Sequence, residues 1–525
     1  MKKRNRILAA LLCLTMAGSL MACGSSADQA QTSSGTETGA GTGTEEDKTS
    51  LSVAVHQDPL SMAPNAYSSN GFIIAQIYDQ LWYLIDGERI MRAAESVETN
   101  DDLHFTIKMK EGIVDTAGNE IKASDVLFSI SLAKNGTSGY PGATRFVDVE
   151  NSEVIDDYTL KVAMTQPCSF QIDSLSLVNL VSEASYNSSP DQMVEVPIGS
   201  GPYKLSEYVT GSYAKLEANE DYWDGAPEIK NITVTIIQEG SQRTNALLTG
   251  EADLVNFLPA IDAETVQNTN GLEFWAEDSI NTATIMFNCS SVSPCANVDL
   301  RQAIAYALNN AALMQAACQG YATPVTTSTT SQFADYDPDW ETITEGNGYY
   351  AYNLEMAKEC LARSGVPEGT TLKLIHGSTT EEIPNVEIIQ ANLAEIGLNV
   401  EIFPYPNVKM QVITDQPEDW DIAWNSWTNY PAQSTLATFN TFLGTNQVHM
   451  EGEEEEQVLG LISEAMSCYD DAERKDIMME LETVLFNNIP IYGLYSPQRL
   501  WGYKEGLNLK WKCQDFPIFA EMSWK

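Results

Sequence analysis

Basic residues and histidine are scarce in this chain of 525 residues. Lys and Arg total 29 against 73 Asp and Glu, which gives a formal net charge of -44 at pH 7. A surface this acidic repels the phosphate backbone of nucleic acids, so we expect no nucleic acid as a partner. The acidity slightly favours cationic ligands, but the need for solubility alone accounts for it.

The motifs of several common catalytic centres are absent. The chain contains no G-x-S-x-G elbow, no H-E-x-x-H pair and no G-x-x-x-x-G-K-[ST] loop. The four histidines, His56, His104, His376 and His449, lie far apart in the sequence and predict neither a metal site nor a catalytic triad. A glycosidase-type pair among the 73 acids is left open by the sequence. We therefore expect no enzyme and no cofactor, with an extracellular hydrolase as the least favoured alternative.

Long hydrophobic runs are absent after the N-terminus. The run from Ile7 to Met16 follows four basic residues and is too short for a membrane-spanning helix, which needs about 20 apolar residues. It leads to Leu20-Met21-Ala22-Cys23, a sequence typical of the cleavage site of a bacterial lipoprotein. We predict a signal peptide over residues 1–22 and lipidation of the Cys23 thiol.

Residues 23–50 contain no aromatic side chain and almost no large apolar one. Ser, Gly, Thr, Ala, Gln, Glu and Asp dominate, and such a composition cannot offset the entropy lost on ordering. This segment is therefore expected to be a disordered tether. It would hold the rest of the chain at the extracellular face of the bacterial cytoplasmic membrane, which is the periplasmic side where an outer membrane exists.

Cysteine spacing gives no zinc pattern. Nine cysteines are present, of which Cys13 would leave with the signal peptide and Cys23 would carry lipid. An odd number then remains, so they cannot all pair within the chain. Cys289 and Cys295 are close enough in sequence to form a disulfide, but small buried thiols are the favoured interpretation. The remaining cysteines are Cys168, Cys289, Cys295, Cys318, Cys360, Cys468 and Cys513.

Strands and helices alternate irregularly over residues 51–525, and this length predicts two or three cores. Alternating apolar residues predict strands at 51–55, 104–108, 158–162, 232–236, 372–375 and 400–403. Helical periodicity predicts helices over 73–81, from Ser124, from an Asp299 cap to Leu308, from Leu354 to Gly365, from Val386 to Gly397, and before Pro490. A helix, a glycine and a strand in succession around Gly397 are typical of an α/β layer.

Two conspicuous strings suggest a known family. Gly199–Leu205 and Leu216–Pro227 resemble the signature of the peptide/nickel class of ABC-transporter solute-binding proteins, the oligopeptide- and dipeptide-binding family 5. Arg243–Asp253, Asp299–Asn309 and Tyr352–Ala362 are similar to further segments of that family, in the same order. Locally, the glycines around Pro202 allow a tight turn, and Tyr222-Trp223 is an aromatic plug beside another turn, so the signature is expected to be scaffold.

The resemblance implies an α/β, two-lobed periplasmic-binding-protein-like fold (type II, cluster C) with a small inserted extra domain. The lobes of this fold close on a ligand by rotating about a hinge, here expected near Phe287-Asn288 and Ile489-Pro490. Projected onto this chain, lobe I takes residues 51–92, 196–287 and 490–525, the inserted domain takes 93–195, and lobe II takes 288–489.

The aromatic stretch from Trp420 to Pro431 is the first candidate for a ligand site. Clefts of this kind need aromatic walls and a few aligned polar groups, which Trp424, Asn425, Trp427, Asn429 and Tyr430 offer. In the family's peptide binders, the corresponding stretch carries an Asp-Tyr pair whose carboxylate holds the peptide's α-ammonium. Here Asn429 precedes Tyr430, and a neutral amide lacks the strength of a charge-assisted bond. Either another acid replaces it, or the ligand is a polar neutral molecule such as a glycan.

A second wall is predicted at Asn70, Gly71 and Phe72. In the peptide-binding relatives this position offers extended backbone to the ligand, and a plain loop before a helix is the equally favoured alternative. Arg145 of the inserted domain is a candidate partner for a ligand carboxylate, although a lone arginine more often forms a surface ion pair.

Together these features predict a lipid-anchored, extracellular solute-binding receptor. It would act as a monomer and deliver a small ligand, first of all a peptide, to the membrane permease subunits of an ABC importer. A glycan, a nickel chelate or another polar solute, or a role in sensing, is the alternative within the same fold.

Overall fold

The computed structural model of the chain describes residues 48–65, 71–85, 88–135, 143–168, 170–325, 327–344, 350–377, 382–406, 408–428, 434–468, 470–509 and 517–525. They lie within one compact unit that runs from Asp47 to Lys525. The predicted signal peptide and Cys23 lie outside the described residues, as does the predicted tether up to Asp47.

A seven-stranded sheet collects strands from three separate parts of the chain, in the order β12-β19-β11-β1-β10-β9-β8. Its central strand, β1, runs parallel to β10 and β11. Because side chains alternate along a strand, Leu51, Val53 and Val55 of β1 join one core with α1, and Ala54 joins the other core with α5 and α6. The elements are β1 (Ser50–Val55), α1 (Gly71–Ile74), β8 (Tyr203–Val209), β9 (Tyr213–Ala218), β10 (Asn231–Ile236), α5 (Gly240–Thr249), β11 (Leu254–Val255), α6 (Ala263–Gln267), β12 (Leu272–Glu277) and β19 (Arg499–Lys504).

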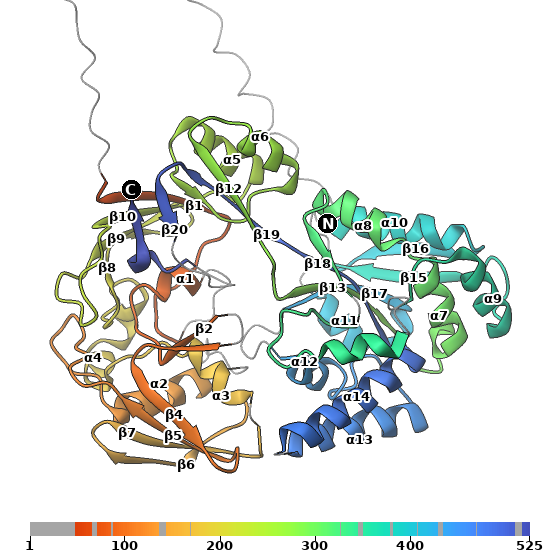
Figure 1. Cartoon of the computed structure of the whole chain (residues 1–525), viewed down its shortest axis with the longest axis horizontal. Helices are drawn as coiled ribbons and strands as arrows, with labels where there is room; N and C mark the ends of the chain where they lie inside the picture. Colours follow the sequence, from red (N-terminus) through yellow and green to blue (C-terminus); the bar gives the residue numbers. More distant parts are fainter. Residues whose placement is uncertain are drawn as a thin grey trace, which may run out of the picture. The chain divides into compact units, whose positions relative to one another are not determined.

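A six-stranded sheet has the order β14-β18-β13-β17-β15-β16, and helices surround its core. Strand β15 runs parallel to both β16 and β17, and helices α13 and α14 lie side by side (Figure 1). The strands are β13 (Asn281–Phe287), β14 (Ala322–Pro324), β15 (Thr371–His376), β16 (Asn399–Pro404), β17 (Ile422–Thr428) and β18 (Ile491–Pro497). The helices are α7 (Val298–Ala307), α8 (Asn310–Cys318), α9 (Leu354–Ser364), α10 (Glu382–Ala394), α11 (Lys409–Asp415), α12 (Thr435–Phe442), α13 (Glu453–Ser467) and α14 (Asp471–Asn488).

A four-stranded sheet of order β4-β5-β7-β6 packs with α2 around a core of its own. Its elements are β4 (Ala94–Thr99), β5 (His104–Met109), α2 (Ala123–Asn135), β6 (Val147–Asp156) and β7 (Thr159–Met164). The remaining short elements are β2 (Trp82–Ile85), β3 (Glu88–Met91), α3 (Gln171–Ser174), α4 (Glu183–Ser188), β20 (Leu507–Leu509) and β21 (Met522–Trp524).

The chain passes between the two large sheets at two places. Strand β12 leads into β13 through residues 278–280, and β18 leads into β19 through Gln498 (Figure 1). Both crossings lie about ten residues from the predicted hinge at Phe287 and Pro490, because β13 and β18 pair with each other inside the six-stranded sheet. The boundaries of the predicted lobes stay a prediction.

The predicted α/β pattern is confirmed, since the six expected strands correspond to β1, β5, β7, β10, β15 and β16. Helix α9 ends at Gly365, which has a left-handed φ of 66° as expected for a terminating glycine. The predicted cap of α7 is wrong by two residues. Asn297 is the cap, and its side chain accepts a hydrogen bond from Leu300 N at 3.2 Å.

The predicted helix over residues 73–81 is wrong in extent, because α1 ends at Ile74. Backbone groups beyond it bind the signature segment instead of continuing the helix. Gly201 N donates to Ile77 O and Tyr203 N donates to Gln76 O, both at 2.9 Å. A Cβ built on Gly199 would lie 2.1 Å from Ile77 O, so only glycine permits this approach. The signature glycines therefore act as scaffold.

The aromatic part of the signature covers a buried carboxylate. Tyr222 Oη donates to Asp79 Oδ1 and Trp223 Nε1 donates to Asp79 Oδ2, both at 2.8 Å. Burial raises the pKa of Asp79 to about 6, although these hydrogen bonds oppose the shift. The predicted aromatic plug thus also satisfies a polar group in the interior.

Replacing Gly199 with Ala is expected to lower the free energy of unfolding by about 3 kcal/mol, because the new Cβ must displace backbone. Gly460→Ala is the matched control. Gly460 is an exposed residue of α13 with open space around its Cβ position, and Ala should stabilise the helix there by up to about 1 kcal/mol. Urea unfolding of both variants tests this, and equal effects would contradict the scaffold role.

The described cysteines Cys168, Cys289, Cys295, Cys318, Cys360 and Cys468 are free thiols, as favoured from the sequence. Burial raises the pKa of Cys289 to about 12, which makes it an inert packing residue. Cys513 lies outside the described residues. Within the described part of the chain, no helix combines the length and apolar character needed to cross a bilayer.

Candidate functional site

The carboxyl ends of β15, β16 and β17 meet at one edge of the six-stranded sheet, because these strands run in the same direction. In open α/β sheets, ligands bind outside this kind of edge. His376 ends β15, Thr428 ends β17, and Lys409 starts α11 just after β16.

Lys409 is the centre of a polar group at this edge. Its Nζ donates to Trp424 O at 3.0 Å and to Asn425 Oδ1 at 3.2 Å. The same nitrogen lies 3.4 Å from Glu382 Oε1. The Lys409 side chain is 13% exposed, and burial lowers its pKa while Glu382 acts in the opposite direction. An ammonium thus fixes the middle of β17 relative to the start of α10.

Glu382 joins this group to the end of β15. Its Oε2 lies 3.6 Å from His376 Nδ1, and both side chains are buried. A Cβ on Gly377 would lie 2.9 Å from each carboxylate oxygen, so the glycine leaves room for the carboxyl group. The end of β15, the middle of β17 and the starts of α10 and α11 therefore present one acid, two basic side chains and one amide together.

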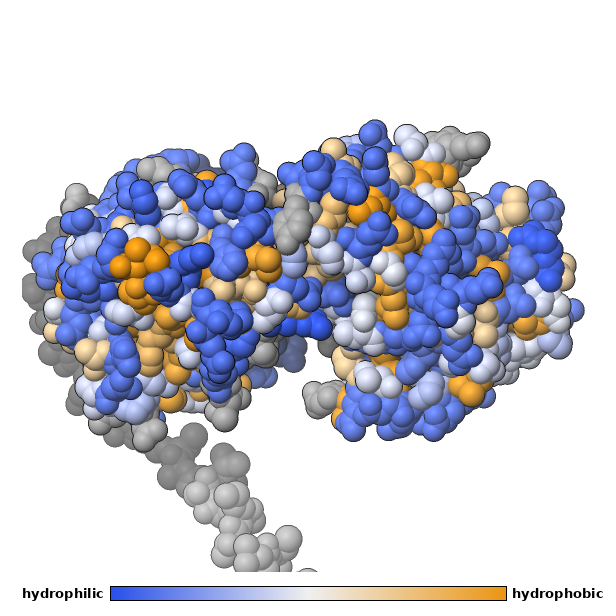
Figure 2. Space-filling view, turned by 90° about the horizontal axis from the view of Figure 1, so that it is seen from below, coloured by the Kyte–Doolittle hydropathy of each residue, from blue (hydrophilic) through white to orange (hydrophobic). Residues whose placement is uncertain are grey.

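Exposed apolar residues are the sequence neighbours of Glu382 and Lys409. Ile383 follows Glu382 and is 41% exposed, and Val408 and Met410 flank Lys409 at 44% and 39%. A few fixed polar groups among apolar side chains are the usual composition of a small-molecule site. The face of the molecule that Figure 2 shows is largely hydrophilic and carries small, separate hydrophobic patches.

The seven-stranded sheet has a corresponding edge at the carboxyl ends of β1, β10 and β11. The His56 and Phe257 rings lie 4.4 Å apart there, and the Arg499 guanidinium lies 5.3 Å from the centre of the Phe257 ring. Arg243 Nη2 donates to Phe257 O and its Nη1 donates to Ile237 O, both at 2.8 Å. The arginine thereby satisfies backbone carbonyls at two strand ends.

This second edge holds unused hydrogen-bonding capacity. Asn256 is buried, and its Oδ1 has no hydrogen-bond partner among the described residues. Burial, with Arg243 and Arg499, lowers the pKa of His56 to about 4, so the imidazole is neutral at pH 7. Phe257 has a φ of 49°, a conformation that is costly for an aromatic residue and is often retained at functional sites.

Of the predicted site residues, the structure brings Trp424 and Asn425 together with Lys409. Both are 6% exposed, and the Trp424 ring belongs to the core with Lys409 Nζ 5.6 Å from its centre. Trp427 pairs through its backbone with Thr282 of β13. Asn70, Asn429 and Tyr430 lie outside the described residues, as do the side chains of Trp427 and Phe72.

The structure also places two other predicted positions. Gly71 and Phe72 are the first residues of α1, and their role as a ligand wall stays a prediction. Arg145 is exposed before β6, its guanidinium lies 5.2 Å from the centre of the Phe146 ring, and its role as a partner for a ligand carboxylate also stays a prediction.

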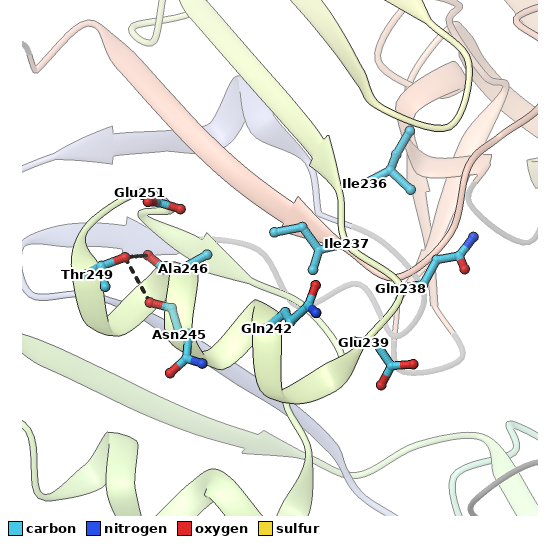
Figure 3. A pocket seen from close by; sticks show the side chains of 9 residues that line it. All are labelled: Ile236, Ile237, Gln238, Glu239, Gln242, Asn245, Ala246, Thr249 and Glu251. Carbon is cyan, nitrogen blue, oxygen red and sulfur yellow. Dashed lines mark hydrogen bonds between the residues drawn. The ribbon is translucent and has the colours of Figure 1, made fainter. Parts of the chain in front are cut away.

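Lys409 and Glu382 are not among the residues predicted from the sequence. Only their position in the sequence could have indicated them. Each follows a predicted strand by a few residues, and the edge of a sheet, where ligands bind, is expected there. The same rule would have selected His56, which follows the predicted strand 51–55, but not Asn256, because β11 was not predicted. A separate groove of about 550 Å³ lies beside α5, and its lining includes Gln242, Asn245 and Thr249 of this helix and Ile236 and Ile237 at the end of β10 (Figure 3). Within the described part of the chain, no cluster of His, Cys, Asp and Glu could hold a metal ion.

Known proteins share both the sequence pattern and the fold. Residues 89–449 match the profile of the bacterial extracellular solute-binding proteins, family 5. The glutathione-binding protein GsiB of Escherichia coli K12 is 27% identical over 365 residues, 67% of this chain and 68% of GsiB. AppA from Clostridium difficile superposes with a TM-score of 0.79 at 21% identity, covering 91% of this chain and all of AppA.

NikA from Staphylococcus aureus, solved with Ni(L-His)2, superposes with a TM-score of 0.72 at 18% identity, covering 91% of this chain and all of NikA. The profile covers well over half of the chain, and the fold agrees over most of its length. The chain therefore belongs to the bacterial extracellular solute-binding proteins of family 5, the peptide/nickel class that serves ABC importers.

Proposed function

We propose that the chain is a lipid-anchored receptor that binds a peptide at the carboxyl edges of its two large sheets. It then passes the peptide, chemically unchanged, to the permease of an ABC importer. The observation that carries the proposal is the polar group of Lys409, Asn425, Glu382 and His376, whose sequence neighbours include exposed apolar residues, in a chain of a solute-binding family.

A peptide suits the chemistry of both edges. It offers amide donors and acceptors for Asn256 and Asn425, side chains for the apolar residues, and charged ends for the arginines and acids. GsiB is named for glutathione, which is itself a tripeptide. Glu382 is the described acid that could take the place of the carboxylate absent at Asn429. Its pairing with Lys409 makes it a weaker anchor than an unpaired carboxylate.

The proposal places the working protein at the extracellular face of the membrane. Cleavage before Cys23 and lipidation of its thiol would tether a monomer beside the permease. Rotation about the crossings at 278–280 and Gln498 would bring the two edges together around the solute.

Thermal-shift measurements with defined probes test the ligand class. Reduced glutathione, peptides of two to nine residues, Ni(II) with L-histidine, and oligosaccharides are added separately to the purified chain. We expect peptides to raise the melting temperature, because a ligand that binds only the folded state stabilises it. A shift with the chelate or the sugars alone would replace the peptide proposal, and recovery of a cleaved peptide would point to a hydrolase.

Trp427→Ala is expected to weaken the binding of an active probe at least tenfold while the unliganded protein still melts cooperatively, since an aromatic wall is lost. Tyr352→Ala is the matched control, because Tyr352 is an exposed aromatic residue just before α9. Isothermal titration measures both. Equal affinities in the two variants would remove β17 from the site.

A further inference from the structure

The turn between β4 and β5 contacts α14 of the six-stranded sheet. Asp102 lies in this turn, and its Oδ2 is 3.6 Å from Arg474 Nη2 in the first turn of α14. The two side chains are 18% and 17% exposed, so the ion pair is mostly shielded from water. It joins the four-stranded sheet to a helix that packs in the core of the six-stranded sheet.

Both partners are held in position by their own neighbourhoods. Arg474 Nη2 also donates to Cys468 O at 2.7 Å, and its Nη1 donates to Asp471 Oδ1 at 2.6 Å. Asp102 N donates to Thr99 Oγ1 at 3.0 Å, and Asp102 has a φ of 48° that fixes the turn. The guanidinium is therefore held in place and the backbone of Asp102 is fixed, so less side-chain entropy is lost on pairing than for two free side chains.

Cys168 makes an apolar contact beside the ion pair. It follows β7 of the four-stranded sheet and is 2% exposed, yet the other buried members of its cluster all lie between residues 283 and 495. Phe146 and Phe170 meet edge to face at 6.4 Å at the border of this cluster. Burial raises the pKa of Cys168 to about 12, so its thiol is unreactive while the contact holds.

We propose that Asp102, Arg474 and Cys168 form a clasp that holds the four-stranded sheet against α14 and opens to admit solute. The four-stranded and six-stranded sheets have separate buried clusters among the described residues, apart from Cys168. One ion pair and the apolar contact of Cys168, Phe146 and Phe170 are far weaker than either core, so the contact breaks without unfolding of either part. The clasp rests on the proposed capture of solute, because only a receptor that opens and closes needs such a contact.

Alkylation of Cys168 reports on the clasp without any ligand. The purified chain is treated with iodoacetamide, and mass spectrometry of peptides gives the rate at each cysteine. Cys295, which is fully buried in the six-stranded sheet's core, is the internal reference for unfolding. We expect Asp102→Asn to raise the alkylation rate of Cys168 about fivefold relative to that of Cys295. This is the increase that the loss of one partly buried ion pair would cause.

Asp101→Asn is the matched control. Its side chain lies in the same turn but accepts hydrogen bonds from Leu103 N and His104 N, which asparagine can also accept. The rate at Cys168 should therefore stay unchanged. Arg474→Gln should reproduce the increase, and the double variant with Asp102→Asn should add nothing further, because both changes remove one interaction.

Two results would overturn the clasp. One is an unchanged rate at Cys168 in both Asp102→Asn and Arg474→Gln, and the other is a parallel rise at Cys295, which would mean unfolding rather than opening. In 1 M NaCl the unaltered chain should show a faster rate at Cys168 and Asp102→Asn should not; equal salt responses would also count against it. If only the clasp proposal is wrong, the probes still raise the melting temperature. If the proposed receptor function is wrong, no probe raises it.

Discussion

Replacing Arg301 with Met is expected to lower the free energy of unfolding by about 3–5 kcal/mol, the usual cost of breaking a buried charge pair. The Arg301 side chain on α7 is fully buried, and its Nη2 donates to Glu454 Oε1 of α13 at 2.8 Å. Its Nε also donates to Asn488 O at 2.7 Å and its Nη1 to Cys295 O at 2.9 Å. The variant leaves these acceptors without their donor in the interior.

Arg363→Met is the matched control for this prediction. Arg363 on α9 pairs with Asp299 at 2.9 Å, but the two side chains are 52% and 31% exposed. Because solvent screens such a pair, its loss should cost far less stability than the loss of Arg301. Urea unfolding compares the variants, and similar losses in both would show that burial does not strengthen the Arg301 contacts.

Replacing Glu482 with Gln is expected to stabilise the protein at alkaline pH. Glu482 on α14 is buried, and neither carboxylate oxygen has a hydrogen-bond partner among the described residues. Burial, with a contribution from Asp335, raises the pKa of Glu482 from 4.5 to about 8. The folded state thus keeps its proton up to about pH 8, whereas the unfolded chain loses it near pH 4.5.

The direction in which stability changes with pH follows from this difference in proton binding. Between pH 4.5 and 8 the folded state binds more protons at this position than the unfolded state, so stability falls as the pH rises. Glutamine does not titrate, and the advantage of Glu482→Gln should grow by up to about 4 kcal/mol between pH 4.5 and 8.5. Urea unfolding at several pH values measures it. The exposed residue Glu480 on the same helix gives a control, since Glu480→Gln should show no such growth.

Glu482 also bears on the candidate site. Asp335 accepts hydrogen bonds from Ser434 Oγ at 2.7 Å and Thr435 N at 2.6 Å, and so caps α12. Helix α12 begins shortly after Tyr430 and the other predicted ligand residues that follow β17. A gain in Glu482→Gln that does not change with pH would contradict the raised pKa of Glu482. It would mean that the folded and unfolded states bind the same number of protons at this position.

Local patterns determined most of the secondary structure and the family. The alternation that predicts β1, β10 and β15 and the glycine that ends α9 act over a few residues, so they can be read along the chain. The family motifs are likewise continuous strings. The extent of α1 was not predictable in this way. Hydrogen bonds from the backbone of Gly201 and Tyr203, which lie far along the sequence, determine the conformation of the chain after Ile74.

The candidate site was predictable only in part. The aromatic stretch led to Trp424 and Asn425 on β17, but the same signal could not show that the Trp424 ring is a core side chain. Lys409 and Glu382 carry no distinctive motif in a chain with 73 acids. Their importance arises from the strand order, which brings the end of β15 and the middle of β17 beside the starts of α10 and α11.

The sequence by itself determined the acidic surface, the α/β alternation, the signature turns and the membership of a solute-binding family, because each depends on composition or on neighbours in the chain. The tertiary structure alone decided which charges meet. Lys409 with Glu382, Arg301 with Glu454 and Asp102 with Arg474 pair residues from separate elements, and their strength depends on burial, which only the packed fold sets.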